Sequence, residues 1–284
     1  MVFLCRSDPA FPYMLDMVYT KNQKDQEIPR KQMINSEIFN ILPLDISRLM
    51  NNPELFTTKK KDSMTTAGIL KGKAFGFQQD LFIKKFAPRS PFNFFLRKLT
   101  GSRAIRIFRL SEKLLMKGLP VPAPLAYIEP TLKDQNAFYI SLAVENCENL
   151  AIVLTEEKSH ELQTIASLLA KMLAHWHREG AVHGDLKWPN ILLQSDKQGQ
   201  RFFLADLDQT KIYFKPHIAG IIKDLSRFYR SGLEVSHEHW ADNFFFPFYM
   251  EALPNDIRAR LDLTSIRNMA LKKWRKKGQI QYCK

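Results

Sequence analysis

Apolar and polar residues follow a strand-like pattern in the first half of the chain and a helical pattern in the second half. Short apolar runs separated by glycines predict strands within residues 68–86. Apolar side chains at helical spacing then predict a helix over residues 102–117. Two more strands are expected around residues 125–128 and 137–144, before a long helix over about 159–178.

A hairpin and a mainly helical region complete the pattern. The hairpin strands are expected at residues 191–193 and 202–204, and residues 217–277 are predicted to be mostly helical. Residues 1–62 carry no comparable pattern and are interpreted as a partly irregular extension. Strands with one helix among them, followed by a helical half, indicate an α+β fold.

The segment between the long helix and the hairpin carries the most specific chemical signal. Residues 183–190 read His-Gly-Asp-Leu-Lys-Trp-Pro-Asn, and Leu-Ala-Asp-Leu-Asp follows at 204–208. An acid, an amide five residues later and a second acid after a short apolar run are the groups that phosphoryl transfer uses. We expect Asp185 to orient the attacking hydroxyl, and Asn190 and Asp206 to hold Mg²⁺ on a nucleotide.

Further residues of this segment extend the predicted site. Lys187 is expected to steady the transferred phosphate as a second catalytic residue, and His183 to brace the loop. Asp208 is the alternative metal ligand beside Asp206. The competing interpretation is a surface loop that contains these residue types by chance. It does not account for their spacing between a helix and a pair of strands.

A lysine at the end of a predicted strand is a candidate for nucleotide binding. Lys84 follows the apolar run 81–83 and is expected to contact the α and β phosphates, with Lys85 as the alternative. Such a lysine pairs with a glutamate on the next helix. Glu112 is the only acid of the predicted 102–117 helix, although it could instead pair with a neighbouring lysine at the surface.

Composition and charge narrow the classes of partner. A net charge of +13 and a pI near 9.6 indicate an anionic partner, unless the charge serves only solubility. Nucleic-acid binding accounts for the charge but not for the motif, so no nucleic-acid partner is expected. Three scattered cysteines are typical of a reducing compartment. The chain has no run of about eighteen apolar residues and no unbroken apolar core at its start, so a cytoplasmic location is predicted.

Several segments resemble the lipopolysaccharide kinase family, the Kdo- and heptose-kinase (WaaP/InaA-like) group of the protein-kinase-like superfamily, and they follow one another in the same order as in that family. The resemblance covers roughly residues 66–235. The catalytic-loop motif is common to the superfamily, whereas the arginine-rich helix with its GLPVPAP sequel, and KDLSRF, are more specific to the family. The segments that carry the resemblance are SRAIRIFRLSEKLLMKGLPVPAPLAYIE, AFYISLAVENCENL, HGDLKWPNILL, LADLDQT and KDLSRFYRSG.

The resemblance implies a bilobal protein-kinase-like fold, with a small β-rich N-lobe at about 63–145 and a helical C-lobe at about 146–284. It implies ATP- and Mg²⁺-dependent transfer of the γ-phosphate to a sugar hydroxyl of the lipopolysaccharide inner core, or of a lipid-linked sugar acceptor. The expected location is the cytoplasmic face of the inner membrane. Glu145 and Cys147 fall where the chain crosses between lobes and would bind adenine through their backbone.

Two departures from the family pattern keep other functions open. Family members often carry a glutamate directly after the arginine that corresponds to Arg106, and here that residue is Ile107. Leu-Asp follows Asp206 where protein kinases have Phe-Gly, which argues against an ordinary protein kinase with a switching activation loop. The alternatives are another small-molecule kinase, an atypical serine/threonine kinase, or a pseudokinase that binds nucleotide without turnover.

Two basic segments are candidates for contact with an anionic membrane surface. Residues 91–99 combine three phenylalanines with two cations, and residues 271–277 read Leu-Lys-Lys-Trp-Arg-Lys-Lys. The alternative for each is a solvated helix face. The sequence gives no indication of oligomeric state.

Overall fold

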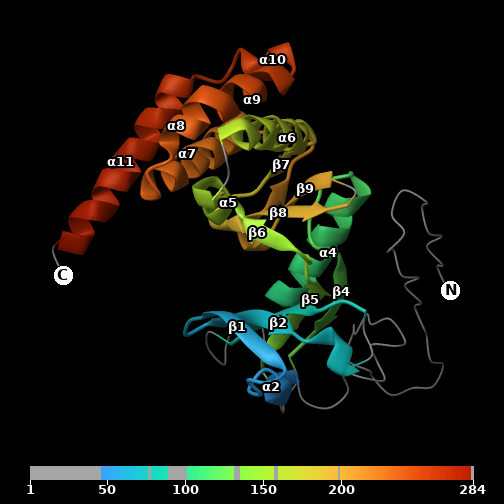
Figure 1. Ribbon diagram of the computed structural model, residues 1–284. Coiled ribbons are helices and arrows are strands. Elements are labelled where there is room, and N and C mark those ends of the chain that lie inside the picture. Colours follow the sequence, from blue (N-terminus) through green and yellow to red (C-terminus); the bar gives the residue numbers. More distant parts are fainter. Residues whose placement is uncertain are drawn as a thin grey trace. The chain divides into compact units, whose positions relative to one another are not determined.

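The chain forms two compact units, one rich in strands and one mainly helical (Figure 1). The first unit contains the described residues up to Lys113 together with Pro122–Glu145, and the second contains Leu114–Val121 and Asn146–Lys284. The computed structural model describes residues 46–75, 78–88, 101–130, 135–156, 159–197 and 199–282.

A five-stranded antiparallel sheet organises the first unit, in the spatial order β1-β2-β3-β5-β4. A short helix, α2, precedes it, a 3₁₀ turn, η1, follows β2, and the helix α4 separates β3 from β4. The bounds are α2 Ile46–Leu49, β1 Phe56–Lys61, β2 Thr65–Leu70, η1 Gly72–Phe75, β3 Leu81–Phe86, α4 Arg103–Met116, β4 Pro124–Ile128 and β5 Ala137–Leu142.

One face of this sheet packs on the N-terminal part of the described chain. Alternate residues of a strand point to opposite faces, so Leu81 and Ile83 of β3 share a face. Both are fully buried in a cluster that also contains Ile46 of α2 and Phe56 of β1. Burying α2 and β1 in this way makes them part of the sheet unit, which therefore begins before residue 63, the predicted start of the kinase-like domain.

The helix α4 covers the opposite face, where Lys84 lies. Lys84 pairs with Tyr139 of β5, and directly paired residues place their side chains on the same face. The Tyr139 hydroxyl lies 3.2 Å from the Ser111 hydroxyl of α4, and Phe108 of α4 packs against Tyr127 with ring centroids 5.1 Å apart. Lys84 and α4 are thus on one side of the sheet.

The second unit combines two small sheets with a group of helices. The sheets have the orders β6-β8-β9 and β10-β7. Their bounds are β6 Cys147–Asn149, β7 Ala181–Val182, β8 Ile191–Asp196, β9 Gly199–Leu204 and β10 Lys211–Ile212. The helices are α5 Leu150–Glu156, α6 Ser159–Arg178, α7 Ile218–Glu234, α8 Glu238–Trp240, α9 Phe246–Ala252, α10 Asn255–Arg258 and α11 Leu263–Tyr282. Two 3₁₀ turns, η2 at Trp188–Asn190 and η3 at Leu207–Gln209, and a π-helical turn, η4 at Ala241–Phe245, complete the unit.

An aromatic cluster forms the core of the helical unit. The rings of Trp188, Phe228, Trp240 and Phe245 lie within 4.3 to 6.4 Å of their neighbours, measured between centroids. The Trp240 indole also donates a hydrogen bond to the Leu162 carbonyl of α6, at 2.9 Å. Trp188 belongs to the predicted phosphoryl-transfer segment, so this core holds one end of that segment directly.

The structure confirms the main elements expected from the hydrophobic pattern. The predicted helices over 102–117 and 159–178 are α4 and α6, and the predicted hairpin is β8–β9. The α+β fold class is also confirmed, because the strand-rich unit is followed along the chain by the mainly helical one. Gly68 lies inside β2, where an added Cβ would come within 2.3 Å of the Thr57 carbonyl oxygen.

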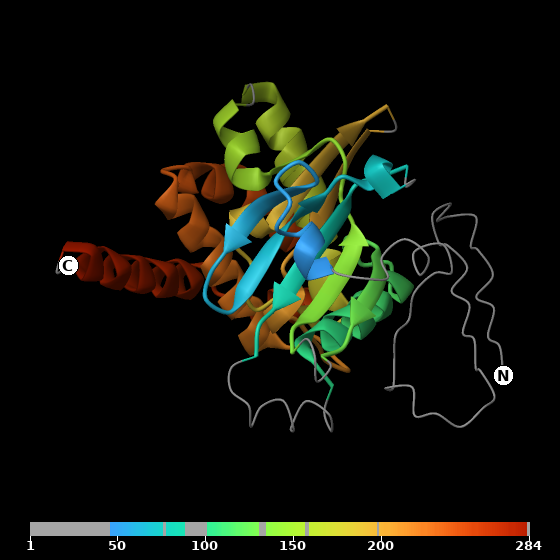
Figure 2. The same cartoon turned by 90° about the horizontal axis from the view of Figure 1, so that it is seen from below.

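The last helix, α11, extends past the other helices of its unit (Figures 1 and 2). Its first half packs on α7 and buries Ile266 and Ala270, whereas the side chains of residues 272–276 are exposed. None of the helices in the described part of the chain has the length and apolar character needed to cross a bilayer. The basic, aromatic stretch 91–99 lies outside the described residues.

Candidate functional site

A short loop between β7 and β8 carries the residues predicted for phosphoryl transfer. The loop ends in the 3₁₀ turn η2, where Pro189 stands near the start and needs no hydrogen-bond acceptor. Trp188 is fully buried, and its backbone N–H donates to the Ser231 hydroxyl of α7 at 3.0 Å. The loop is therefore anchored in the hydrophobic core at one end while Asp185 stays half-buried at the other.

The carboxylate of Asp224, on α7, holds the beginning of the loop. Its two oxygens accept the backbone N–H groups of His183 at 2.6 Å and Gly184 at 2.8 Å. Asp224 is 1% exposed, and its hydrogen bond with the buried His183 N–H forms where water does not compete. Gly184 has φ 80°, and an added Cβ would come within 2.7 Å of the Gln209 carbonyl oxygen. Only glycine fits this close approach.

Two buried side chains support Asp224 from the other side. The His177 ring places Nε2 3.5 Å from the Asp224 carboxylate and Nδ1 2.6 Å from the Tyr249 hydroxyl. Burial, with Asp224 as a second cause, raises the pKa of Tyr249 well above its usual value, so its hydroxyl keeps its proton and can donate to Nδ1. The His177 ring then carries its proton on Nε2, on the side that faces the Asp224 carboxylate.

His183 braces the loop as a neutral side chain. Its Nε2 lies 2.9 Å from the Ala205 carbonyl oxygen, which can only accept, and its Nδ1 lies 3.3 Å from the Asp185 N–H, which can only donate. Both contacts are satisfied by a neutral ring with its proton on Nε2. Burial lowers the pKa of His183, although Asp224 and the Ala205 carbonyl oppose the shift.

Cations from two different elements contact the Asp185 carboxylate. Lys187 Nζ lies 3.2 Å from Oδ2, and Arg227 Nε of α7 donates to Oδ1 at 3.0 Å. The Asn190 amide nitrogen donates to the Asp185 carbonyl at 2.9 Å and lies 3.4 Å from Oδ2. The two oxygens of Asp185 therefore face different neighbours.

The backbone brings the two expected metal ligands, Asn190 and Asp206, close together. Because the Asn190 amide nitrogen is engaged by Asp185, its oxygen is left for a cation. The backbone N–H of Ala205 donates to the Asn190 carbonyl at 2.9 Å, which brings Asp206 next to the loop. Asp206 has φ 61° and ψ 59°, a left-handed conformation that aspartate tolerates better than most residues.

No group of three His, Cys, Asp or Glu side chains that could hold a metal is found among the described residues. Mg²⁺ is commonly bound through one or two carboxylates together with substrate phosphates, rather than by an all-protein cage. Asn190 and Asp206 supply the hard oxygen ligands that such an arrangement needs, so the residues present fit the ion.

The first unit contains Lys84 and Glu112, two of the residues predicted to bind nucleotide. Lys84 is 5% exposed and its ammonium lies 5.5 Å from the centre of the Phe86 ring, whereas Lys85 is only partly buried. Glu112 is partly buried, and this burial raises its pKa although Arg109 opposes the shift. Glu112 makes no ion pair within 4 Å in the part of the chain that the structure describes, so its pairing with Lys84 stays a prediction.

The predicted crossing between lobes coincides with the boundary between the two units. Glu145 is the last residue of the first unit, and from Asn146 onward the chain belongs to the second. Asn146 has φ 46°, and Cys147 opens β6, where it pairs with Gln194 of β8. The roles of Glu145 and Cys147 in adenine binding remain predictions.

Asp224 and Arg227 are the site residues that the sequence interpretation missed. Both lie in the segment Lys-Asp-Leu-Ser-Arg-Phe, which was used only to identify the family resemblance. An acid within the buried stripe of an amphipathic helix was the available signal, since buried carboxylates require partners. The spacing of three residues then places Arg227 on nearly the same side of α7.

Replacing Asp224 is expected to destabilise the protein strongly. The Asp224→Ala variant leaves the buried His183 N–H without its acceptor, which costs about 1–3 kcal/mol, and also removes the partly buried hydrogen bond of the Gly184 N–H, which contributes about 0.5–1.5 kcal/mol. We expect urea denaturation to show a loss of about 1.5–4.5 kcal/mol, with faster hydrogen exchange at His183 and Gly184. Glu251→Ala removes an exposed acid of α9 and should change stability by about 0.5 kcal/mol or less. Equal stabilities of the two variants would contradict the anchoring role.

Stability should fall with decreasing pH because of His183. Its folded-state pKa is lowered by burial, so below about pH 6.5 the unfolded chain binds more protons than the folded chain. The contribution is complete above that pH and is lost as the pH falls, at a slope of up to about 1.4 kcal/mol per pH unit. Urea denaturation between pH 5 and 8 should show a smaller slope for His183→Gln. An unchanged slope would mean that His183 is not held neutral.

Comparison with known proteins assigns the chain to a family. The model of the lipopolysaccharide kinase (Kdo/WaaP) family matches residues 79–245, more than half of the chain. A 3-deoxy-D-manno-octulosonic acid kinase of Xylella fastidiosa (strain M12) is 32% identical over 143 residues, which are 50% of this chain and 54% of the relative. The enzyme of the same name from Mannheimia succiniciproducens is 30% identical over 156 residues, or 51% of this chain and 62% of the relative. The match thus spans little more than half the length of these relatives.

A solved structure shows the same fold. The chain matches a structure described as WaaP in complex with acyl carrier protein with a TM-score of 0.56 at 15% identity, over 87% of this chain and 98% of that chain. At this identity the likeness establishes the fold and no more. The family model matches from just before β3, through the loop of residues 183–190, to the end of η4, so the chain belongs to the lipopolysaccharide kinase (Kdo/WaaP) family.

Proposed function

We propose that this protein is a kinase that transfers the γ-phosphate of ATP to a sugar hydroxyl of the lipopolysaccharide inner core. The observation that carries the proposal is the geometry of residues 183–190, in which Asp185 and Asn190 are held together by a hydrogen bond and their loop is anchored by Asp224. Membership in the family supports the same reaction.

Each residue of the loop has a defined part in the proposed mechanism. Asp185 accepts the hydrogen bond of the acceptor hydroxyl and aligns its oxygen with the phosphorus atom. Lys187, 3.2 Å from Asp185, moves its charge toward the transferred phosphoryl group. Such a transfer passes through a loose transition state, so positioning and charge contribute more than covalent chemistry.

Magnesium and nucleotide would be held by the remaining predicted residues. Asn190 and Asp206 would bind Mg²⁺, which neutralises charge on the nucleotide phosphates. Lys84 would contact the α and β phosphates, and the backbone at Glu145 and Cys147 would bind adenine. The two relatives are 3-deoxy-D-manno-octulosonic acid kinases, which favours that sugar as the acceptor, with a core heptose as the alternative.

Transfer of labelled phosphate to lipopolysaccharide tests the proposal. Purified protein with radiolabelled ATP, Mg²⁺ and extracted lipopolysaccharide should label the lipid, and Asp185→Asn should reduce the rate by about 10²–10⁴-fold. Asp196→Asn, an exposed acid on β8, is the matched control and should retain activity. Label on protein alone, or equal labelling by Asp185→Asn, would contradict the proposal. Mg²⁺-dependent nucleotide binding without turnover on any acceptor would favour a pseudokinase.

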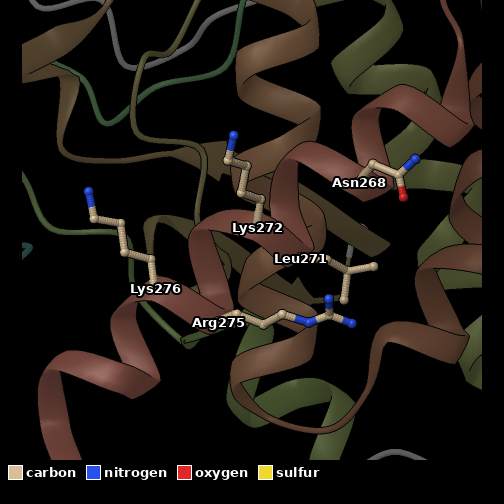
Figure 3. Close-up of a pocket in the computed structure, with 5 residues that line it drawn as sticks. All are labelled: Asn268, Leu271, Lys272, Arg275 and Lys276. Atoms are coloured by element: carbon tan, nitrogen blue, oxygen red, sulfur yellow. The ribbon is translucent and has the colours of Figure 1, made fainter.

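We also propose that the end of α11 contacts the anionic inner-membrane surface, which places the protein peripherally at its cytoplasmic face. No acidic residue follows Asp262, and Figure 3 shows Lys272 and Lys276 extending to the same side of the helix. They line a shallow pocket with Asn268, Leu271 and Arg275. The Trp274 side chain is 40% exposed beside them, as in interfacial helices.

The charge of this helix end suits a diffuse negative surface. Lys272, Lys273, Arg275 and Lys276 have no carboxylate within 4 Å in the described part of the chain. At helical spacing Lys273 and Arg275 point to different sides, so the charge is distributed around the helix rather than shaped for one small ligand. Each such cation contributes about 1 kcal/mol near an anionic leaflet.

Vesicle binding tests this part of the proposal. We expect the triple variant Lys272→Gln, Arg275→Gln, Lys276→Gln to bind phosphatidylglycerol vesicles about 100-fold more weakly, since three contributions of about 1 kcal/mol are lost. The same change at the exposed lysines Lys59, Lys60 and Lys61 of β1 is the control. Equal loss in the control, or equal binding to neutral vesicles, would contradict membrane contact. If the triple variant bound vesicles normally and lost only binding to acyl carrier protein, the protein seen with WaaP in the solved structure, the partner would be an acidic protein instead.

A further inference from the structure

We infer that Arg227 and Lys187 form an anion-binding site beside Asp185 that recognises a carboxylate or phosphate group on the acceptor sugar. The identity of the ligand as an acceptor rests on the proposed kinase function, whereas the site itself rests on the side chains around Asp185. An acceptor of this class is an acidic or phosphorylated sugar rather than a neutral one.

Most of the hydrogen-bond donors of Arg227 have no acceptor among the described residues. A guanidinium carries five N–H groups. Its Nε–H donates to Asp185 Oδ1 at 3.0 Å, but its nearest other ion pair, Nη1 to Glu234 Oε1, is 3.9 Å long and too distant for a hydrogen bond. The Arg227 side chain is 23% exposed, so a ligand can reach the terminal nitrogens.

Positive charge exceeds negative charge in this cluster of ion pairs. Glu234 lies 3.9 Å from Arg227 and also 3.9 Å from Arg230, so one carboxylate is shared by two arginines. Asp185 is likewise shared by Lys187 and Arg227. Three cations are thus connected to two carboxylates, and an incoming anion would balance the remaining charge.

A second arginine of α7 also has an unused donor. The Nε atom of Arg230 is buried and has no hydrogen-bond partner among the described residues. A buried N–H group without an acceptor costs about 1–3 kcal/mol, so its retention calls for an explanation. One turn of helix separates Arg230 from Arg227, and an anion between the two guanidinium groups would satisfy both.

The position of Arg227 indicates an acceptor group rather than a nucleotide phosphate. Arg227 and Lys187 contact different oxygens of Asp185. If Lys187 accompanies the transferred phosphoryl group at Oδ2, Arg227 stays at Oδ1, next to the hydroxyl that Asp185 aligns. A planar guanidinium binds carboxylate and phosphate in two-point contacts, which would orient the sugar as well as attract it.

Kinetics with paired acceptors test the inference. The acceptors are the methyl glycoside of 3-deoxy-D-manno-octulosonic acid, its carboxamide, and a methyl heptoside with and without a phosphate group. Wild-type protein should favour the anionic member of a pair by about 10- to 100-fold in kcat/KM, as expected for a charge-assisted hydrogen bond. The pair that shows this preference identifies carboxylate or phosphate as the recognised group.

Variants of α7 distinguish recognition of the anion by Arg227 from support of Asp185 by Arg227. Arg227→Gln should bring the preference to about one, Arg227→Lys should retain part of it, and Lys223→Gln, an exposed cation on the same helix, should leave it unchanged. The preference is a ratio measured on one protein sample, so partial unfolding of a variant does not alter it. If Arg227→Gln slows both members of each pair equally, Arg227 only supports Asp185 and the inference is wrong.

Direct binding distinguishes failure of this inference from failure of the kinase proposal. Calorimetry with the carboxylate glycoside and its carboxamide needs no turnover. Absence of turnover, with carboxylate binding that depends on Arg227, would overturn the kinase proposal and support the anion site. Turnover without any preference for an anion would support the kinase proposal and overturn the anion site, and absence of both binding and turnover would overturn both.

Discussion

The buried carboxylate of Asp224 accepts the backbone N–H groups of His183 and Gly184, and the geometry of the candidate site depends on this contact. The N–H groups of His183 and Gly184 lie outside the strand ladder and the 3₁₀ turn, and unsatisfied backbone groups in a buried setting are costly. Asp224 supplies both acceptors from α7. Because His177 lies 3.5 Å from the same carboxylate and 2.6 Å from the Tyr249 hydroxyl, the network reaches from the loop through α7 to α6 and α9.

A hydrophobic anchor complements this polar one. Trp188 buries its whole side chain among Phe228 and Trp240, so the loop cannot shift without disturbing the core of its unit. Asp185 lies between the polar anchor at residues 183–184 and the anchor at Trp188. A side chain fixed from both sides is positioned before any substrate binds. Such positioning can supply a large part of an enzyme's rate enhancement.

The sequence predicted the elements of the fold whose signals are local. The stripe of α6 and the alternation of β8 and β9 depend on residues close together in the chain, and these elements were confirmed. It did not predict that α2 and β1 belong to the sheet unit, because Phe56 is buried by residues as distant as Ile140. Similarly, Arg227 lies 42 positions from Asp185, and nothing in local spacing connects an α7 arginine with a loop acid.

The three α7 residues that reach the loop explain how one helix can set the site. Asp224 binds the backbone before Asp185, Arg227 binds the Asp185 side chain, and Ser231 binds the backbone after it. Their spacing of three and four residues keeps them on one side of the helix, in the same order as the loop residues they contact. Lys187 and Arg227 each contact one oxygen of the Asp185 carboxylate and hold it in place, which suits a role in orienting a hydroxyl. That role agrees with a loose transition state, in which the acceptor loses its proton late.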